Sequence, residues 1–113
     1  MSNIRLKAKL KDGITEVKAL IKHPMETGAR KELETGKLIP AHFIEEVTCA
    51  HNGHIVMSAL WSGGISQNPY CAFTFKGGAE GDKVTLIWKD NKGDINHQET
   101  RIKEIKIKNV TEK

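Results

Sequence analysis

The most regular feature of the chain is an alternation of apolar and polar residues. From Ile4 to Leu10 every second residue is apolar, and Arg5, Lys7 and Lys9 stand between them. Successive side chains of a strand point to opposite faces, so this period of two predicts a strand with one buried face. Similar segments follow at residues 14–22, 41–51, 55–61, 70–75 and 84–88, and again from residue 95 onward.

Turn signals separate these segments. Asp12-Gly13 and Asn52-Gly53 are pairs that favour tight turns between antiparallel strands. Pro24 ends the second segment, because proline has no N–H to donate to a neighbouring strand. Seven short strands without a long amphipathic helix predict an all-β fold, an antiparallel β-sandwich of immunoglobulin-like type.

The alternation also predicts which residues share a face of a strand. The expected groups are Phe43, Val47 and Cys49 opposite Ile44, Thr48 and Ala50; Ile55, Met57, Ala59 and Trp61; and Cys71, Phe73 and Phe75. In the last strand the spacing of Ile102, Ile105 and Ile107 slips by one residue, which predicts a β-bulge near Lys103 and Glu104.

The length of 113 residues is that of one domain. We assign residues 1–108 to it and interpret residues 109–113 as a flexible C-terminal tail. Residues 25–40 form a long polar connection, in which residues 29–34 are expected to make a short helical turn. Connections of this length are often functional, so a binding surface is expected here.

The charge pattern argues against binding of nucleic acid. The net charge is only +4, and the lysines near both ends alternate with apolar residues, as on the solvent face of an amphipathic strand. No apolar run approaches the roughly 20 residues that span a bilayer, so no membrane association is expected. The N-terminal segment also lacks the apolar stretch of a signal peptide, which by itself indicates a cytoplasmic protein.

A loop at residues 61–69 combines backbone constraint with apolar groups. Gly63-Gly64 permits unusual backbone angles. Pro69 restricts its own backbone angle φ and the backbone conformation of the preceding residue, Asn68. Trp61, Ile65 and Tyr70 are apolar groups that this loop can expose. The combination indicates a recognition surface rather than a reaction centre.

Cysteine and histidine residues offer one candidate metal site. Cys49 and His51 share a strand face, and His54 follows across the turn; thiolate and imidazole bind iron, copper or zinc. The run CAHNGHIVMSALW at residues 49–61 is similar to superoxide reductase, an immunoglobulin-like iron protein with four histidines and a cysteine, but does not reproduce its ligand pattern. A metal-dependent redox domain is therefore the alternative function. The competing interpretation is that Cys49 is a small core residue and that the histidines are polar surface groups without a ligand. The two cysteines allow one disulfide or two free thiols.

The sequence contains no combination of residues that is typical of a catalytic site. Ser58, Ser62 and Ser66 lack the G-x-S-x-G elbow of a nucleophilic serine. Cys71 lies on an aromatic strand face that favours burial. Adjacent Glu45 and Glu46 would point to opposite faces of a strand. We therefore expect no enzyme activity, no catalytic residue, no metal and no cofactor.

Several motifs together resemble the SoxZ family, the small subunits of the SoxYZ sulfur carrier of bacterial thiosulfate oxidation. They are V-K-A-L-I-K-H-P-M-E-T-G-x-R at residues 17–30, G-K-L-I-P at 36–40, F-I-x-x-V-T-C with N-G at 43–53, S-x-N-P-Y at 66–70, and the G-D and W-x-D-N-x-G turns at 81–93. The likeness covers nearly the whole chain, and the combination of HPMETG with S-x-NPY is specific.

The resemblance implies an immunoglobulin-like sandwich that pairs with SoxY as a heterodimer. SoxY bears the sulfur on a cysteine in a glycine-rich C-terminal arm, and the complex meets the thiosulfate-oxidising enzymes. Residues 109–113 contain neither cysteine nor Gly-Gly, so Cys49 and Cys71 are not expected to carry sulfur. The family also implies export to the periplasm together with SoxY, which replaces the cytoplasmic interpretation. Without SoxY, the chain is expected to self-associate as a homodimer.

The two constrained loops supply the predicted partner-binding residues. Met25, Ile65, Pro69 and Tyr70 are expected as apolar anchors, and His23, Pro24 and Asn68 as residues that shape the loops. The competing interpretation is that all seven only hold the loops in place.

Overall fold

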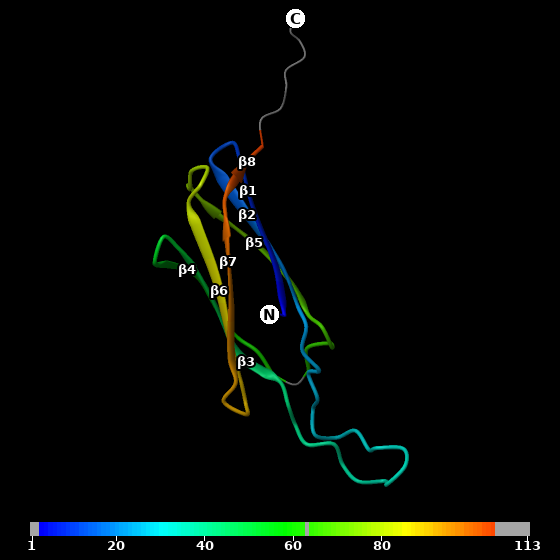
Figure 1. Ribbon diagram of the computed structural model, residues 1–113. Helices are drawn as coiled ribbons and strands as arrows, with labels where there is room; N and C mark the ends of the chain where they lie inside the picture. Colours follow the sequence, from blue (N-terminus) through cyan, green and yellow to red (C-terminus); the bar gives the residue numbers. More distant parts are fainter. Residues whose placement is uncertain (1–2, 63, 106–113) are drawn as a thin grey trace, which may run out of the picture.

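A computed structural model of the chain, which describes residues 3–62 and 64–105, contains eight β-strands and no helix. The strands are β1 (Ile4–Lys11), β2 (Ile14–Ile21), β3 (Ile44–His51), β4 (His54–Leu60), β5 (Tyr70–Lys76), β6 (Lys83–Asp90), β7 (Ile95–Arg101) and β8 (Lys103–Glu104). They form two four-stranded sheets, ordered β5-β2-β1-β8 and β4-β3-β6-β7, which lie as two layers (Figure 1). The predicted β-sandwich is confirmed.

The hairpins follow from the local sequence. In β1 and β2, buried and exposed residues alternate without interruption, and Asp12 and Gly13 both have positive φ, 52° and 77°. Two positive φ values make a turn whose twist matches that of the flanking strands. Asn52 and Gly53, with φ of 49° and 87°, join β3 to β4 in the same way.

The core lies between the sheets. Its buried apolar residues are Ile4, Leu6, Ala8, Leu10, Val17, Ala19, Ile21, Met25, Ile44, Val47, Cys49, Val84, Leu86, Trp88 and Ile102. Cys71, Phe73 and Phe75 pack against them from β5, as the alternation predicts. Both cysteines are free thiols.

Two β-bulges correct the predicted faces of β3 and β4. The register of β3 shifts between Ile44 and Glu46, so Ile44, not Phe43, is fully buried with Val47 and Cys49. The register shifts again between Cys49 and Ala50, opposite β4. As a result Ile55 is 67% exposed, while Val56 and Met57 pack against the core, and the prediction that Ile55 shares a face with Met57 was wrong. One inserted residue reverses the orientation of every residue beyond it.

The last segment changes sheets instead of bulging. β7 ends at Arg101 in one sheet, and β8 pairs in parallel with β1 in the other, with Lys9 opposite Lys103. Ile102, at the crossing, is 2% exposed. The prediction of one bulged strand was therefore wrong, and the crossing adds one short strand to the roughly seven that the sequence predicts. The predicted tail at residues 109–113 and the boundary at 108 lie outside the described residues.

The connection between β2 and β3 is a two-stranded ribbon, not a loop with a helical turn. Antiparallel bridges join Glu26 to His42 and Lys31 to Leu38. The ribbon projects beyond one end of the sandwich (cyan in Figure 1), and Leu33 near its tip is fully exposed. The helical turn expected at residues 29–34 was wrong.

No helix among the described residues is long and apolar enough to cross a membrane.

Candidate functional site

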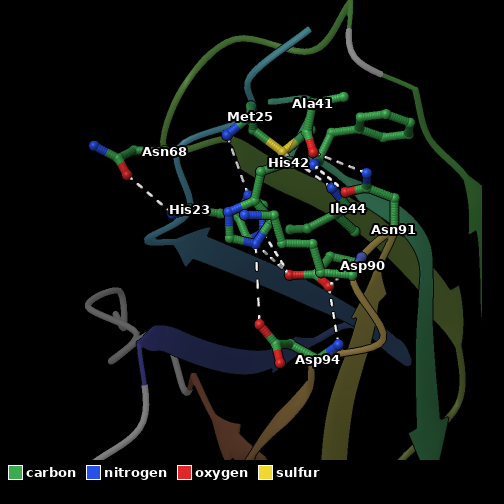
Figure 2. Close-up of polar contacts among 11 residues, drawn as sticks. His23, Met25, Ala41, His42, Ile44, Asn68, Asp90, Asn91 and Asp94 are labelled. Atoms are coloured by element: carbon green, nitrogen blue, oxygen red, sulfur yellow. Dashed lines mark hydrogen bonds and ion pairs between the residues drawn. The ribbon is translucent and has the colours of Figure 1, made fainter. Parts of the chain in front are cut away.

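A buried cluster of two histidines and an aspartate joins three segments where the ribbon meets the sandwich (Figure 2). His23 follows β2, His42 precedes β3, and Asp90 is the last residue of β6. One carboxylate oxygen of Asp90, Oδ2, lies 3.0 Å from Nε2 of His23 and 2.7 Å from Nε2 of His42. His23 and Asp90 are only 3% and 1% exposed.

The hydrogen bonds fix the protonation of His23. The backbone N–H of Met25 donates to Nδ1 of His23 at 3.1 Å, so Nδ1 carries no proton. Nε2 must then carry the proton and donate it to Asp90. The other carboxylate oxygen, Oδ1, accepts the backbone N–H groups of Lys92 and Asp94 at 3.0 and 2.9 Å. Asp90 therefore receives four hydrogen bonds, which compensate the burial of its charge.

The surroundings keep Asp90 ionised. Burial acts to raise the pKa of Asp90, but the hydrogen bonds from His23 and His42 and from the backbone of Asp94 and Lys92 outweigh it and lower the pKa below its ordinary value. The cluster is thus a carboxylate that ties the end of β6 to both ends of the ribbon.

The same three side chains are the one group among the described residues whose donor atoms could gather around a metal ion, with those atoms within 4.8 Å of one another. Both ring nitrogens of His23 and both oxygens of Asp90 already have hydrogen-bond partners within the chain. A metal would have to displace those bonds, so the geometry fits a structural clamp better than a metal centre. Sequence reasoning missed this cluster, because Asp90 lies 67 residues from His23 and no local pattern links the two.

We call His23, His42 and Asp90 the clamp. Further hydrogen bonds connect the clamp to the loop at residues 61–69. The side chain of Asn68 accepts the backbone N–H of His23 at 3.0 Å, and the N–H of Asn68 donates to the carbonyl of His23 at 2.9 Å. Met25 has a positive φ of 50°, and its sulfur accepts the N–H of Ile44 at 3.4 Å. The carbonyl of Pro69 accepts the N–H of Ile21. The two predicted loops therefore meet and are held by the same contacts.

The seven predicted partner-binding residues divide by accessibility. His23, Met25 and Pro69 are buried within the chain, and their contacts hold the loops together. Pro24, Asn68 and Tyr70 are exposed, and Ile65 is half-buried against the core, as is Trp61. Partner binding by these residues stays a prediction.

The structure does not bring the donor atoms of Cys49, His51 and His54 together around one point, as a metal site would require. Cys49 is fully buried, and its burial, with a smaller effect of Cys71, raises its pKa to about 12. Nε2 of His51 instead lies 2.8 Å from Asp82, and this hydrogen bond lowers the pKa of Asp82. His54 is exposed. Burial also raises the pKa of Cys71, so neither thiol has the low pKa of a reactive cysteine.

The outer face of the sheet β4-β3-β6-β7 carries exposed apolar residues that the sequence analysis missed, and charged residues such as Glu46, Lys89 and Glu99 lie among them. The register aligns outward-pointing residues in rows across the four strands. Leu60, Ile87, Ile95 and Ile55 are 85%, 40%, 65% and 67% exposed, and the small residues Thr48, Ala50, Ser58 and Thr85 lie between them. We call these eight residues the apolar face. Ile87 stands between two core residues, so the alternation did indicate its outward orientation.

Comparison with known proteins gives a family and a fold. The family model described as "Sulphur oxidation protein SoxZ" matches residues 4–101, which is most of the chain. No curated protein matches significantly.

Solved structures match over most of their length. A variant of the superoxide reductase (neelaredoxin) from Ignicoccus hospitalis aligns with a TM-score of 0.65 at 17% sequence identity, covering 92% of this chain and 81% of that one. The hypothetical protein PH1083 from Pyrococcus horikoshii OT3 aligns with a TM-score of 0.62 at 14% identity, covering 88% and 87%. At such identities these likenesses establish the fold alone.

Proposed function

This chain belongs to the SoxZ family of sulphur oxidation proteins, and on that premise we propose that it is the non-catalytic subunit of the periplasmic SoxYZ sulfur carrier. In this role it binds SoxY as a heterodimer and helps to present the sulfur-bearing arm of SoxY to the thiosulfate-oxidising enzymes. Export in complex with SoxY would bring it to the periplasm.

The observation that carries the proposal is the apolar face. Three isoleucines and a leucine, all at least 40% exposed, lie on one side of one sheet. Stable subunit interfaces have apolar centres, and exposed apolar patches on a small domain mark sites of association. SoxY is the proposed occupant of this face. In its absence, the same face would favour the homodimer.

The chemistry of the cysteines supports a partner role rather than a carrier role. A sulfur carrier needs an accessible thiol that readily forms a thiolate. Cys49 is fully buried with a pKa of about 12, and burial raises the pKa of the half-buried Cys71 as well. Sulfur is therefore proposed to travel on SoxY alone.

The alternative of a metal-dependent redox domain rests on fold likeness. The superoxide reductase of Ignicoccus hospitalis shares the fold at 17% identity. In this chain the residues that suggested a metal are engaged otherwise: Cys49 in the core and His51 with Asp82. No observation favours this alternative over the subunit role.

Replacing Ile87 by glutamate tests the proposed interface. Ile87 lies in the centre of the apolar face, and a buried unpaired carboxylate there should weaken SoxY binding at least about tenfold. Titration of SoxY by isothermal calorimetry measures the affinity. Ile14→Glu is the matched control, because Ile14 is a similarly exposed isoleucine (45% against 40%) on the outer face of the other sheet. Equal affinity of Ile87→Glu and the native chain would contradict docking on the apolar face, provided both variants keep the native melting temperature.

A further inference from the structure

The opposite side of the sandwich carries a strongly basic surface. On the outward positions of β1, β2 and β5, the charged residues are six cations and a single carboxylate, Glu16, which lies 3.8 Å from Lys18. The cations are Arg5, Lys7, Lys9, Lys11, Lys18 and Lys76, and all are exposed. We call this surface the basic face. Alternation alone explains that these lysines point outward, but not that almost no acidic residue accompanies them.

A hollow lies at one end of the basic face. It is lined by Asn3, Ile4, Arg5, Leu20, Ile21, Lys22 and Asn68. Arg5 lies opposite Leu20, and Leu20 lies opposite Tyr70, so these three side chains form one row across three strands. Leu20 is 43% and Tyr70 61% exposed. The hollow thus combines two cations and two asparagines with the apolar side chain of Leu20, and Tyr70 lies opposite Leu20 on the neighbouring strand.

The two cations of the hollow are available for a ligand. Within the described residues, neither Arg5 nor Lys22 has an ion-pair partner, whereas Arg30, Lys18 and Lys83 do. An arginine fork binds a carboxylate through two parallel hydrogen bonds, and a neighbouring apolar wall makes such a bond stronger by excluding water. The rows of lysines beyond the hollow would attract a negatively charged molecule from a distance.

The composition of the surface favours a protein over a nucleic acid. Binding of single-stranded nucleic acid uses aromatic side chains on which successive bases stack, and this face offers only Tyr70. Arginine and tyrosine, which lie here on either side of Leu20, are instead residues enriched at the centres of protein interfaces. Because this surface lies on the sheet opposite the apolar face, one chain could contact two partners at once.

We propose that the basic face docks an acidic protein surface, and that the hollow receives a carboxylate-bearing segment with an apolar side chain next to it. The partner is not the one assigned to the apolar face. The binding is transient, because it rests on exposed charges and a small apolar area. The proposal assigns two of the residues predicted for SoxY binding, Asn68 and Tyr70, to this second partner.

Binding of an acidic peptide tests the proposal. The probe is a fluorescein-labelled peptide of glutamates with interspersed leucines, titrated with the full chain, alone and in complex with SoxY, and followed by anisotropy. Arg5→Glu/Lys22→Glu should weaken binding at least about tenfold. Lys37→Glu/Lys92→Glu, which changes the net charge equally through exposed residues that do not line the hollow, should weaken it much less. Affinity for SoxY, measured in parallel, should be the same in both double variants, so this test does not depend on the first.

Two comparisons decide whether the site recognises protein. The same peptide with alanine in place of leucine should bind several-fold more weakly, because the peptide loses its apolar contact with Leu20 and the neighbouring Tyr70. Single-stranded DNA and phosphatidylglycerol vesicles should bind more weakly than the peptide at equal salt. Equal losses in the two double variants, or equal binding of DNA, vesicles and both peptides, would overturn the proposal and indicate a non-specific polycationic surface.

Discussion

At the scale of single residues, Asp90 decides how the binding loops are held. Its carboxylate receives four N–H groups from three segments of the chain, and it is 1% exposed. A carboxylate can accept all four, because it has two oxygens and no proton of its own. Few other side chains could replace it.

Replacing Asp90 by asparagine should therefore destabilise the protein. The new amide group would turn its N–H₂ toward two N–H donors, and the charge that compensates the buried hydrogen bonds would be lost. We expect the free energy of unfolding to fall by about 3 kcal/mol, measured by urea denaturation. Asp94→Asn is the control: this side chain is 69% exposed and should change stability by less than about 0.5 kcal/mol. Equal effects of the two substitutions would contradict the role assigned to Asp90.

The same residue predicts a loss of stability in acid. Folding lowers the pKa of Asp90, so its stabilising contribution is complete above the unfolded pKa of about 4 and is lost as the pH falls through the lower folded pKa. The difference in unfolding free energy between the native chain and Asp90→Asn should be constant at neutral pH and should narrow below about pH 4. Denaturation curves at a series of pH values measure it. A difference that persists unchanged to the lowest pH would show that ionisation of Asp90 does not contribute.

At the scale of elements, the sequence predicts strands better than their irregularities. The uninterrupted alternation of β1, β2 and β6 and the Asn52-Gly53 turn predicted both the strands and the core faces. The sequence did not predict the bulges of β3 and β4 or the crossing at Ile102. Each depends on pairing with a strand distant in the sequence and not on the local pattern of residues. The clamp of His23, His42 and Asp90 was not predicted for the same reason.

The crossing from β7 to β8 depends on Gly78. A Cβ added there would lie 2.5 Å from Oγ1 of Thr15 and 3.0 Å from Cδ1 of Ile102, and φ is +97°. Both Thr15 and Ile102 are buried and have little room to move. Gly78→Ala should therefore lower the free energy of unfolding by about 2–4 kcal/mol.

Gly81→Ala is the matched control for this substitution. Its φ is similar, +89°, but no atom lies within 4 Å of the added Cβ. Only the backbone cost of about 1 kcal/mol is then expected. Thermal unfolding of both variants measures the difference, and equal melting temperatures would show that the contacts with Thr15 and Ile102 do not matter.

At the scale of the whole molecule, the two outer faces differ in character. The outer side of β4-β3-β6-β7 carries the exposed residues of the apolar face, and that of β5-β2-β1-β8 is basic. The sequence predicted a non-catalytic, partner-binding sandwich but directed attention to the loops, because glycine and proline are visible in a sequence and the residues that share an outer sheet face are not. Three of the seven predicted partner-binding residues proved to be internal: His23, Met25 and Pro69 are buried. The faces emerge only when the strand register is known.

The central claim is that this subunit makes no bond to sulfur and that its partner carries the substrate. The most direct measurement is the intact mass of each subunit after the SoxYZ complex has been incubated with thiosulfate and the oxidising enzymes. We predict a sulfur adduct on SoxY and an unmodified mass for this chain, since Cys49 is buried and both thiols have raised pKa values. A sulfane adduct on Cys49 or Cys71 of the native protein would contradict the account.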